Sequence, residues 1–132
     1  MNSTIETILN HKSIRKFQER SLTKEQIETI VKSAQAASTS SFIQAYSIIG
    51  VKDQQKKEKL AELAGNQAYV AQNGHFFVFC ADLHRHELIS EMEAKDFSGA
   101  LESTEKFMVS LIDTGLAAQN ASIAAESMGL GI

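Results

Sequence analysis

The residues best suited to chemistry near the start of the chain lie in the segment HKSIRKF, residues 11–17. If this segment is extended, successive side chains alternate between two faces, so His11, Ser13 and Arg15 share one of them. An imidazole and a hydroxyl can donate hydrogen bonds, and a guanidinium can contact a phosphate bidentately with fixed charge. The spacing therefore predicts an anion-binding face. A solvated basic turn is the alternative, and composition alone favours it.

Two later stretches could line a polar pocket. Residues 36–42, AASTSSF, form an expected loop that is rich in hydroxyls and backbone N–H groups, although such runs are also ordinary loop chemistry. Residues 65–72, GNQAYVAQ, follow a helix stop at Gly65 and include one predicted helical turn at 69–72. A glutamine there can offer both a donor and an acceptor to a planar ligand, or it can simply face water.

Self-contained catalytic motifs are absent from the sequence. It contains no G-x-S-x-G, H-E-x-x-H, C-x-x-C, Walker or G-x-G-x-x-G pattern. His84 and His86 do not predict a metal site, because residues two apart on a helix point away from each other. The single cysteine, Cys80, lies in an apolar run and is interpreted as a small buried side chain. A chain of this kind borrows its chemistry from a cofactor or performs none.

The composition fits one globular domain with a real core. The chain has 132 residues, of which 43% are hydrophobic, and a net charge of -3. No cluster of basic residues is interleaved with aromatic ones, so a nucleic acid partner is not expected. The most apolar run, residues 76–81, is too short to span a bilayer, and residues 1–10 lack the pattern of a leader peptide. We therefore expect a cytoplasmic protein without a membrane partner.

The dominant predicted element is a long helix from about Leu101 to Met128. Large apolar residues recur near the helical period, and small residues between them would let another backbone approach closely. Such a helix would be roughly 40 Å long, about the diameter of a small domain. Burial in a dimer interface is the preferred interpretation, and the core helix of a monomer is the alternative. Gly129 and Gly131 offer a C-cap, and the end of the chain at Ile132 suggests an incomplete architecture.

Other elements follow from caps and periodicity. Capping boxes begin at Ser3 and Thr23, Asp53 and Asp82 are expected N-caps, and residues 96–99 connect to the long helix. Strands are predicted at residues 46–51 and 75–81, the second as a central strand covered on both faces. Strands separated by helices favour a layered sheet with helices packed over it.

Five segments together resemble the N-terminal half of the FMN-dependent nitroreductase family. They are HKSIRKF, AQAASTSSF, GNQAYVAQ, FFVFCAD and DTGLAAQNASIAAESMGLG, in that order. The most similar subgroup is that of the oxygen-insensitive NADPH nitroreductases and NADPH-flavin oxidoreductases. The resemblance implies an α+β fold, a layered α/β/α arrangement with a mixed sheet and a long central helix. Residues 1–132 would then be the N-terminal part of a single nitroreductase-like domain.

The resemblance also implies a function. Family members are homodimers that hold FMN non-covalently at the subunit interface, beside the long helix. They pass a hydride from NADPH through the flavin to nitroaromatics, quinones or free flavin by a ping-pong route. The matching positions here place cofactor-binding roles on His11, Ser13, Arg15, Thr39 and Gln67. Substrate-side positions would be Ser40, Ser41 and Phe42, and no residue is expected to act as an obligatory acid or base.

Two departures from the family pattern leave rival interpretations open. Lys12 replaces the usual arginine, whose side chain would point away from the phosphate face. Members of the subgroup are roughly twice as long, and their second half would supply a glycine loop, a basic pair at the phosphate and an arm around the partner. The rivals are a truncated dimerising protein without flavin or catalysis, and a helical interaction module.

Overall fold

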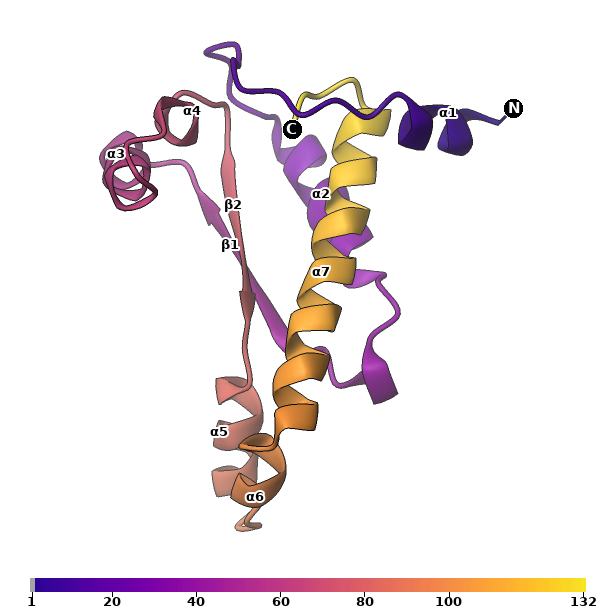
Figure 1. The fold of residues 1–132 in the computed structure, drawn as a ribbon, viewed down its shortest axis with the longest axis vertical. Helices are drawn as coiled ribbons and strands as arrows, with labels where there is room; N and C mark the ends of the chain where they lie inside the picture. The colour runs from indigo at the N-terminus through magenta and orange to yellow at the C-terminus, as the bar shows by residue number, and fades with distance from the viewer. Residues whose placement is uncertain (1) are drawn as a thin grey trace.

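A computed structural model describes residues 2–132 as an α+β protein (Figure 1). This confirms the α+β class predicted from the sequence. The strands described are a single antiparallel pair, so the predicted mixed sheet is not seen in residues 2–132. The elements in chain order are α1 (Ser3–Leu9), α2 (Lys24–Gln35), the 3₁₀ turn η1 (Ser40–Phe42), β1 (Tyr46–Val51), α3 (Gln54–Leu63), α4 (Ala68–Ala71), β2 (Phe76–Ala81), α5 (His84–Met92), α6 (Ser98–Leu101) and α7 (Thr104–Ser127).

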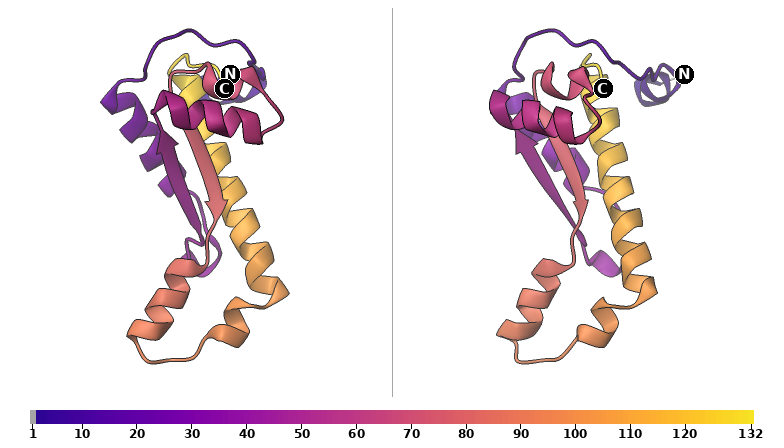
Figure 2. Two further views of the ribbon diagram at one scale, coloured as in Figure 1. Left: turned by 90° about the vertical axis from the view of Figure 1, so that its left-hand side faces the viewer. Right: turned by 60° about the vertical axis from the view of Figure 1, so that its left-hand side comes forward.

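Helix α7 runs along most of the molecule, and the other elements are arranged around it (Figures 1 and 2). It begins three residues later than the predicted Leu101, because the Ser103 hydroxyl caps it by accepting a hydrogen bond from the Lys106 backbone N–H. Residues 98–101 form the separate short helix α6. At the other end Gly129 adopts a left-handed φ of +75°, as the predicted glycine C-cap requires.

The core lies where α2 crosses the small-residue face of α7. Ala117, Ala121 and Ala125 are buried against Ile30 and Ala34 of α2. Spacings of four residues place these alanines on one stripe of the helix, so the two backbones can approach closely. The prediction that small residues on this helix let another backbone approach closely is therefore confirmed. The contact between α2 and α7 forms most of the buried core.

The sheet consists of β1 and β2, which pair antiparallel from Tyr46 opposite Ala81 to Val51 opposite Phe76. The predicted strand at residues 46–51 is confirmed, and β2 starts one residue after the predicted His75. Within residues 2–132, β2 pairs with β1 alone and its side chains are at best half-buried. The interpretation of β2 as a central strand covered on both faces is therefore wrong for this part of the fold.

Two of the predicted helix caps are also corrected. Helix α1 is capped by Asn2, whose side chain accepts the Ile5 backbone N–H at 3.0 Å, and not by Ser3. The N-cap position of α5 is Leu83 and not Asp82, whose carboxylate accepts hydrogen bonds from the Ser47 hydroxyl and the His84 backbone N–H. The capping box at Thr23 and the N-cap at Asp53 are confirmed by their hydrogen bonds.

The face of α7 opposite the core is exposed and apolar along its N-terminal half. Its five large side chains are between 43% and 58% exposed: Phe107, Met108, Leu111, Ile112 and Leu116. No contact within residues 2–132 covers this stripe, which we call the α7 apolar face. Among the same residues, no helix has both the length and the apolar content needed to cross a membrane.

The α2–α7 contact should not tolerate larger side chains. We expect Ala117→Leu to destabilise the protein by about 1–3 kcal/mol, because the added carbons must displace a closely packed helix. Urea unfolding followed by circular dichroism would measure the loss. Gly99→Ala in α6 is the control, since an added Cβ there meets no atom within 4 Å. Equal stability of Ala117→Leu and the wild type would contradict this view of the core.

Candidate functional site

The structure places the predicted site residues in two groups along α7. The segment 11–17, with His11, Ser13 and Arg15, passes the C-terminal end of α7 (Figure 1). Gln67 is connected to Arg15 through Tyr69. The loop that carries Thr39, Ser40, Ser41 and Phe42 is attached near the middle of α7, at Asp113. At 1.5 Å per residue, Asp113 and Glu126 are about 20 Å apart along the helix. One copy of the chain therefore does not bring the two groups together.

The segment 11–17 is extended and has no regular secondary structure. The Ile14 backbone N–H donates to the Ile132 carbonyl at 2.6 Å, and the Ile14 side chain lies against Gly131. Ile14 therefore faces the protein. Burial does not alternate along the segment, since Lys12 and Lys16 are exposed like Ser13 and Arg15, so the predicted shared face of His11, Ser13 and Arg15 stays a prediction. A Cβ at Gly131 would stand 3.0 Å from Ile14 Cγ1, so a larger residue there would push this segment away.

The three predicted anion ligands nevertheless contact different elements. His11 Nδ1 lies 2.8 Å from Glu126 Oε1 on α7. The Arg15 guanidinium donates to the Ile14 carbonyl and stands 5.3 Å from the centre of the ring of Tyr69, a residue of α4. Ser13 is exposed. Within residues 2–132 no hydrogen bond joins these three side chains to one another, so an anion would have to draw them together.

Tyr69 is a residue that the sequence reasoning did not single out. Its hydroxyl donates a hydrogen bond to Oε1 of Gln67, which occupies the N-cap position of α4. Its ring receives Arg15 in a cation–π arrangement. Tyr69 thus links Arg15 to Gln67, two residues predicted from segments more than 50 positions apart. The only available signal was its place in the GNQAYVAQ segment.

A groove of about 740 Å³ opens beside Arg15, between the segment 14–22, β2 and the C-terminal end of α7. Arg15, Lys16 and Arg20 contribute three cations, and no Asp or Glu is among the lining residues. The aromatic residues that line it are Phe17, Tyr69, Phe76, Phe77 and Phe79. Fixed positive charge beside flat apolar surface suits a ligand that has both a phosphate and an aromatic ring, so these residues fit FMN.

His75 forms part of the wall of this groove. Its ring centre lies 4.3 Å from that of Phe77, and both ring nitrogens are buried without a hydrogen-bond partner. Burial lowers the pKa of His75, and the charges of Lys52 and Lys57 lower it further. The ring is therefore held in its neutral form, and the positive charge of the groove comes from the arginines and Lys16.

The hydroxyl loop has an unusual backbone. Ser41, Phe42 and Gln44 have φ values of 52°, 55° and 54°, in the left-handed region that non-glycine residues rarely adopt. Asp113 Oδ1 accepts the Ser40 backbone N–H at 3.0 Å, and the Phe42 side chain is 77% exposed. The Thr39 hydroxyl is buried and lacks a partner. The predicted loop is confirmed, and the structure presents Phe42 to its surroundings.

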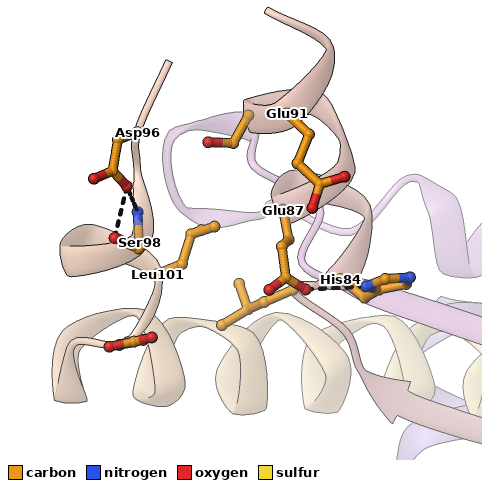
Figure 3. Close-up of a pocket in the computed structure, with 9 residues that line it drawn as sticks. His84, Glu87, Glu91, Asp96, Ser98 and Leu101 are labelled. Carbon is orange, nitrogen blue, oxygen red and sulfur yellow. Dashed lines mark hydrogen bonds and ion pairs between the residues drawn. The ribbon is translucent and has the colours of Figure 1, made fainter. Parts of the chain in front are cut away.

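A second cavity, of about 390 Å³, lies between α5 and α6 and contains none of the predicted site residues (Figure 3). Its wall is acidic, with Glu87 paired to His84 at 3.0 Å and Asp96 bonded to both the backbone N–H and the hydroxyl of Ser98. The charge is unsuited to a phosphate-bearing cofactor. His86 points elsewhere and contacts the Ile43 carbonyl, so the two histidines serve different partners.

The comparisons with known proteins identify the family of the chain. A model of the nitroreductase family matches residues 8–132. The chain belongs to the nitroreductase family. Among its nitroreductase relatives, the FMN reductase (NADPH) of Bacillus subtilis (strain 168) is 69% identical over the whole chain, which covers 53% of that protein. The NADPH-flavin oxidoreductase of Vibrio harveyi is 49% identical over 99% of the chain and is 52% covered.

Solved nitroreductase structures match equally well. NfrA1 of B. megaterium superposes with a TM-score of 0.97 at 74% identity, over 98% of this chain and 53% of that structure. The chain therefore spans about half the length of the curated relatives and solved structures it matches. The likeness confirms the resemblance noted in the sequence, including its restriction to the N-terminal half of family members.

The neutral state of His75 predicts how stability depends on pH. Its folded pKa lies below the ordinary value of 6.5, so the unfolded chain takes up the proton first. This contribution to stability is complete above about pH 6.5 and is lost as the pH falls toward the folded pKa. We expect His75→Phe to reduce the loss of stability between pH 7 and pH 5, measured by urea unfolding at several pH values.

His84→Ala provides the matched control for that experiment. The hydrogen bond to Glu87 raises the pKa of His84, so protonation of His84 favours the folded state as the pH falls. Removing the His84 side chain therefore cannot reduce the loss of folding stability at low pH. The interpretation of His75 fails if His75→Phe and the wild type lose stability in parallel as the pH falls.

Proposed function

We propose that this chain forms the N-terminal part of a single nitroreductase-like domain that binds FMN. The proposed activity is an oxidoreductase reaction in which NADPH gives a hydride through the flavin to a nitroaromatic, a quinone or free flavin. The names of the relatives from B. subtilis and V. harveyi support both the cofactor and the donor. The observation that carries the proposal is the cation-lined groove at Arg15, which is free of carboxylates. We also propose that the reaction takes place in the cytoplasm, where NADPH is available as the donor.

Each residue at this groove would make a different contact with the cofactor. The Arg15 guanidinium supplies fixed charge for the phosphate, and Ser13 is exposed and available to donate. His11 uses Nδ1 for Glu126, which leaves Nε2 for a ligand. The side-chain amide N–H of Gln67 is available for the polar edge of the ring, since its oxygen already accepts from Tyr69. Thr39 would add a hydroxyl from the other group.

Bound FMN would supply the redox chemistry, and the chain would orient the reactants and exclude water. The proposed reaction assigns no residue of either group as an obligatory general acid or base. The substrate-side role of Ser40, Ser41 and Phe42 is supported by the exposure of Phe42 and by the hydrogen bond that attaches its loop to Asp113.

A homodimer through α7 would complete the site. The α7 apolar face is a continuous stripe of large side chains, and such a stripe favours burial against a partner. If two copies of α7 pack antiparallel about a two-fold axis between Asp113 and Glu126, the loop of one copy approaches the Arg15 group of the other. The two groups that one copy holds about 20 Å apart along α7 would then face one ligand.

Arg15→Ala tests the phosphate contact. We expect FMN affinity to fall by about 1–3 kcal/mol, roughly five- to 150-fold, because a charged hydrogen bond is lost. Quenching of flavin fluorescence during titration gives the dissociation constant. Lys12→Ala is the matched control, since Lys12 is exposed and does not line the groove. Unchanged affinity in Arg15→Ala would refute the contact, and a wild-type protein that binds no FMN would favour the flavin-free dimerising alternative.

Ile112→Glu tests the dimer. Ile112 is 54% exposed in the single chain, so the substitution should leave the fold intact while placing an unpaired charge in the proposed interface. We expect a dimeric mass for the wild type and a monomeric mass for the variant in light scattering after size exclusion. Leu63→Glu, at a 73% exposed position on α3, should remain dimeric. A monomeric wild type, or dimers of equal stability, would contradict the interface.

A further inference from the structure

The loop of residues 39–44 is attached to a buried carboxylate on α7, Asp113, to which no role in the site has yet been assigned. We propose that Asp113 is a positioning residue for this loop, and that it presents residues 39–42 to the electron acceptor by fixing the Ser40 backbone. The inference deepens the proposed function and rests on it. Asp113 would touch neither flavin nor acceptor and would act only through Ser40.

The backbone of the loop needs such support. Three of its residues, Ser41, Phe42 and Gln44, are held at left-handed φ values although none is a glycine. Conformations of this kind persist only where surrounding contacts over-determine them. The short η1 turn supplies two local hydrogen bonds, from the Phe42 and Ile43 backbone N–H groups to the carbonyls of Thr39 and Ser40. Further contacts must come from outside the loop.

Asp113 supplies the contact from α7. It is fully buried in the middle of the helix, and its Oδ1 accepts the Ser40 backbone N–H across 73 positions of sequence. A carboxylate in such a place is costly unless it is hydrogen-bonded, so its use as an acceptor for the loop accounts for its presence there. Its Oδ2 and the Thr39 hydroxyl are both buried without partners.

Helix α5 holds the opposite end of the loop. His86 Nε2 lies 2.9 Å from the Ile43 carbonyl, and the Arg85 guanidinium donates to the Gln44 carbonyl at 2.5 Å. Helix α7 thus holds the start of the loop through the Ser40 backbone N–H. Helix α5 holds its end through the Ile43 and Gln44 carbonyls. Phe42 lies between these anchors, 77% exposed and free of them. The direction in which it points therefore depends on both helices, with Asp113 as the deeper anchor.

Hydrogen exchange tests the anchoring directly, without any ligand. We expect Asp113→Ala to speed exchange of the Phe42 and Ile43 amides about tenfold or more, because the turn loses its charged anchor. Asp113→Asn keeps an oxygen acceptor and should stay close to the wild type. Ser110→Ala is the matched control on the same buried face, since the Ser110 hydroxyl bonds only to the Phe107 carbonyl of its own helix.

A second variant covers the case in which Asp113→Ala fails to fold. Ser40→Pro removes the donor of the same hydrogen bond without touching α7, and the first position of a helical turn tolerates proline. It should speed exchange of the same two amides, and the two substitutions combined should do little more than either one. Exchange that is unchanged in both single variants would overturn the proposal.

Steady-state kinetics with FMN-saturated protein test the link to function. With menadione as acceptor, we expect Asp113→Ala to raise KM several-fold with little change in kcat, and Asp113→Asn to restore KM. Faster exchange with an unchanged KM would overturn the presentation of the loop to the acceptor. Failure of the wild type to bind FMN would refute the proposed function and this presentation together, while the exchange data would still decide whether Asp113 anchors the loop.

Discussion

Close packing of α2 against the alanine face of α7 is the constraint on which the rest of the structure depends. Alanines at positions 117, 121 and 125 let Ile30 and Ala34 reach the helix backbone, which fixes α7 as the axis of the fold. The Asn120 side chain reinforces the contact by donating to the Ser33 carbonyl at 3.2 Å. Because one stripe of α7 is used in this way, its opposite stripe is left to large apolar residues.

Carboxylates on α7 hold segments that are distant in sequence. Asp113 anchors the hydroxyl loop, and Glu126 contacts His11 in the extended N-terminal segment. Each acid is thereby turned toward a specific donor, and neither lines the groove that begins at Arg15. The separation of negative charge from this groove leaves its three cations free to attract an anion. Lys57 is another buried charged residue that contacts a distant segment, since it donates to the Asn73 carbonyl.

Local patterns predicted those elements whose cause is local. The capping box at Thr23, the β-branched and aromatic run at residues 46–51 and the glycine stop at Gly129 were each visible within a few residues, and the structure confirms them. The predicted cap at Ser3 was nevertheless wrong, because the neighbouring Asn2 caps the same helix.

Features that depend on distant contacts were not predictable in this way. The link between Asp113 and Ser40 joins positions 73 apart, and in the sequence Asp113 is one more charge on a helix. Tyr69 became relevant only when the fold placed it under Arg15. The left-handed residues of the hydroxyl loop carry no glycine to mark them. The spacing of residues 11–17 predicted His11, Ser13 and Arg15 as an anion-binding face, and the family resemblance added the flavin as the ligand. Whether these residues bind FMN stays a prediction.

The central claim is that α7 carries two half-sites that only a second copy brings together. Mixing two deficient variants tests it most directly: Arg15→Ala, defective in one group, and Ser40→Pro, defective in the other. If the site is shared between subunits, exchange into mixed dimers creates one intact site in each, and FMN-dependent NADPH oxidation should recover toward a quarter of the wild-type value per total site. Activity that stays at the level of the separate variants, after subunit exchange has been verified, would contradict the claim.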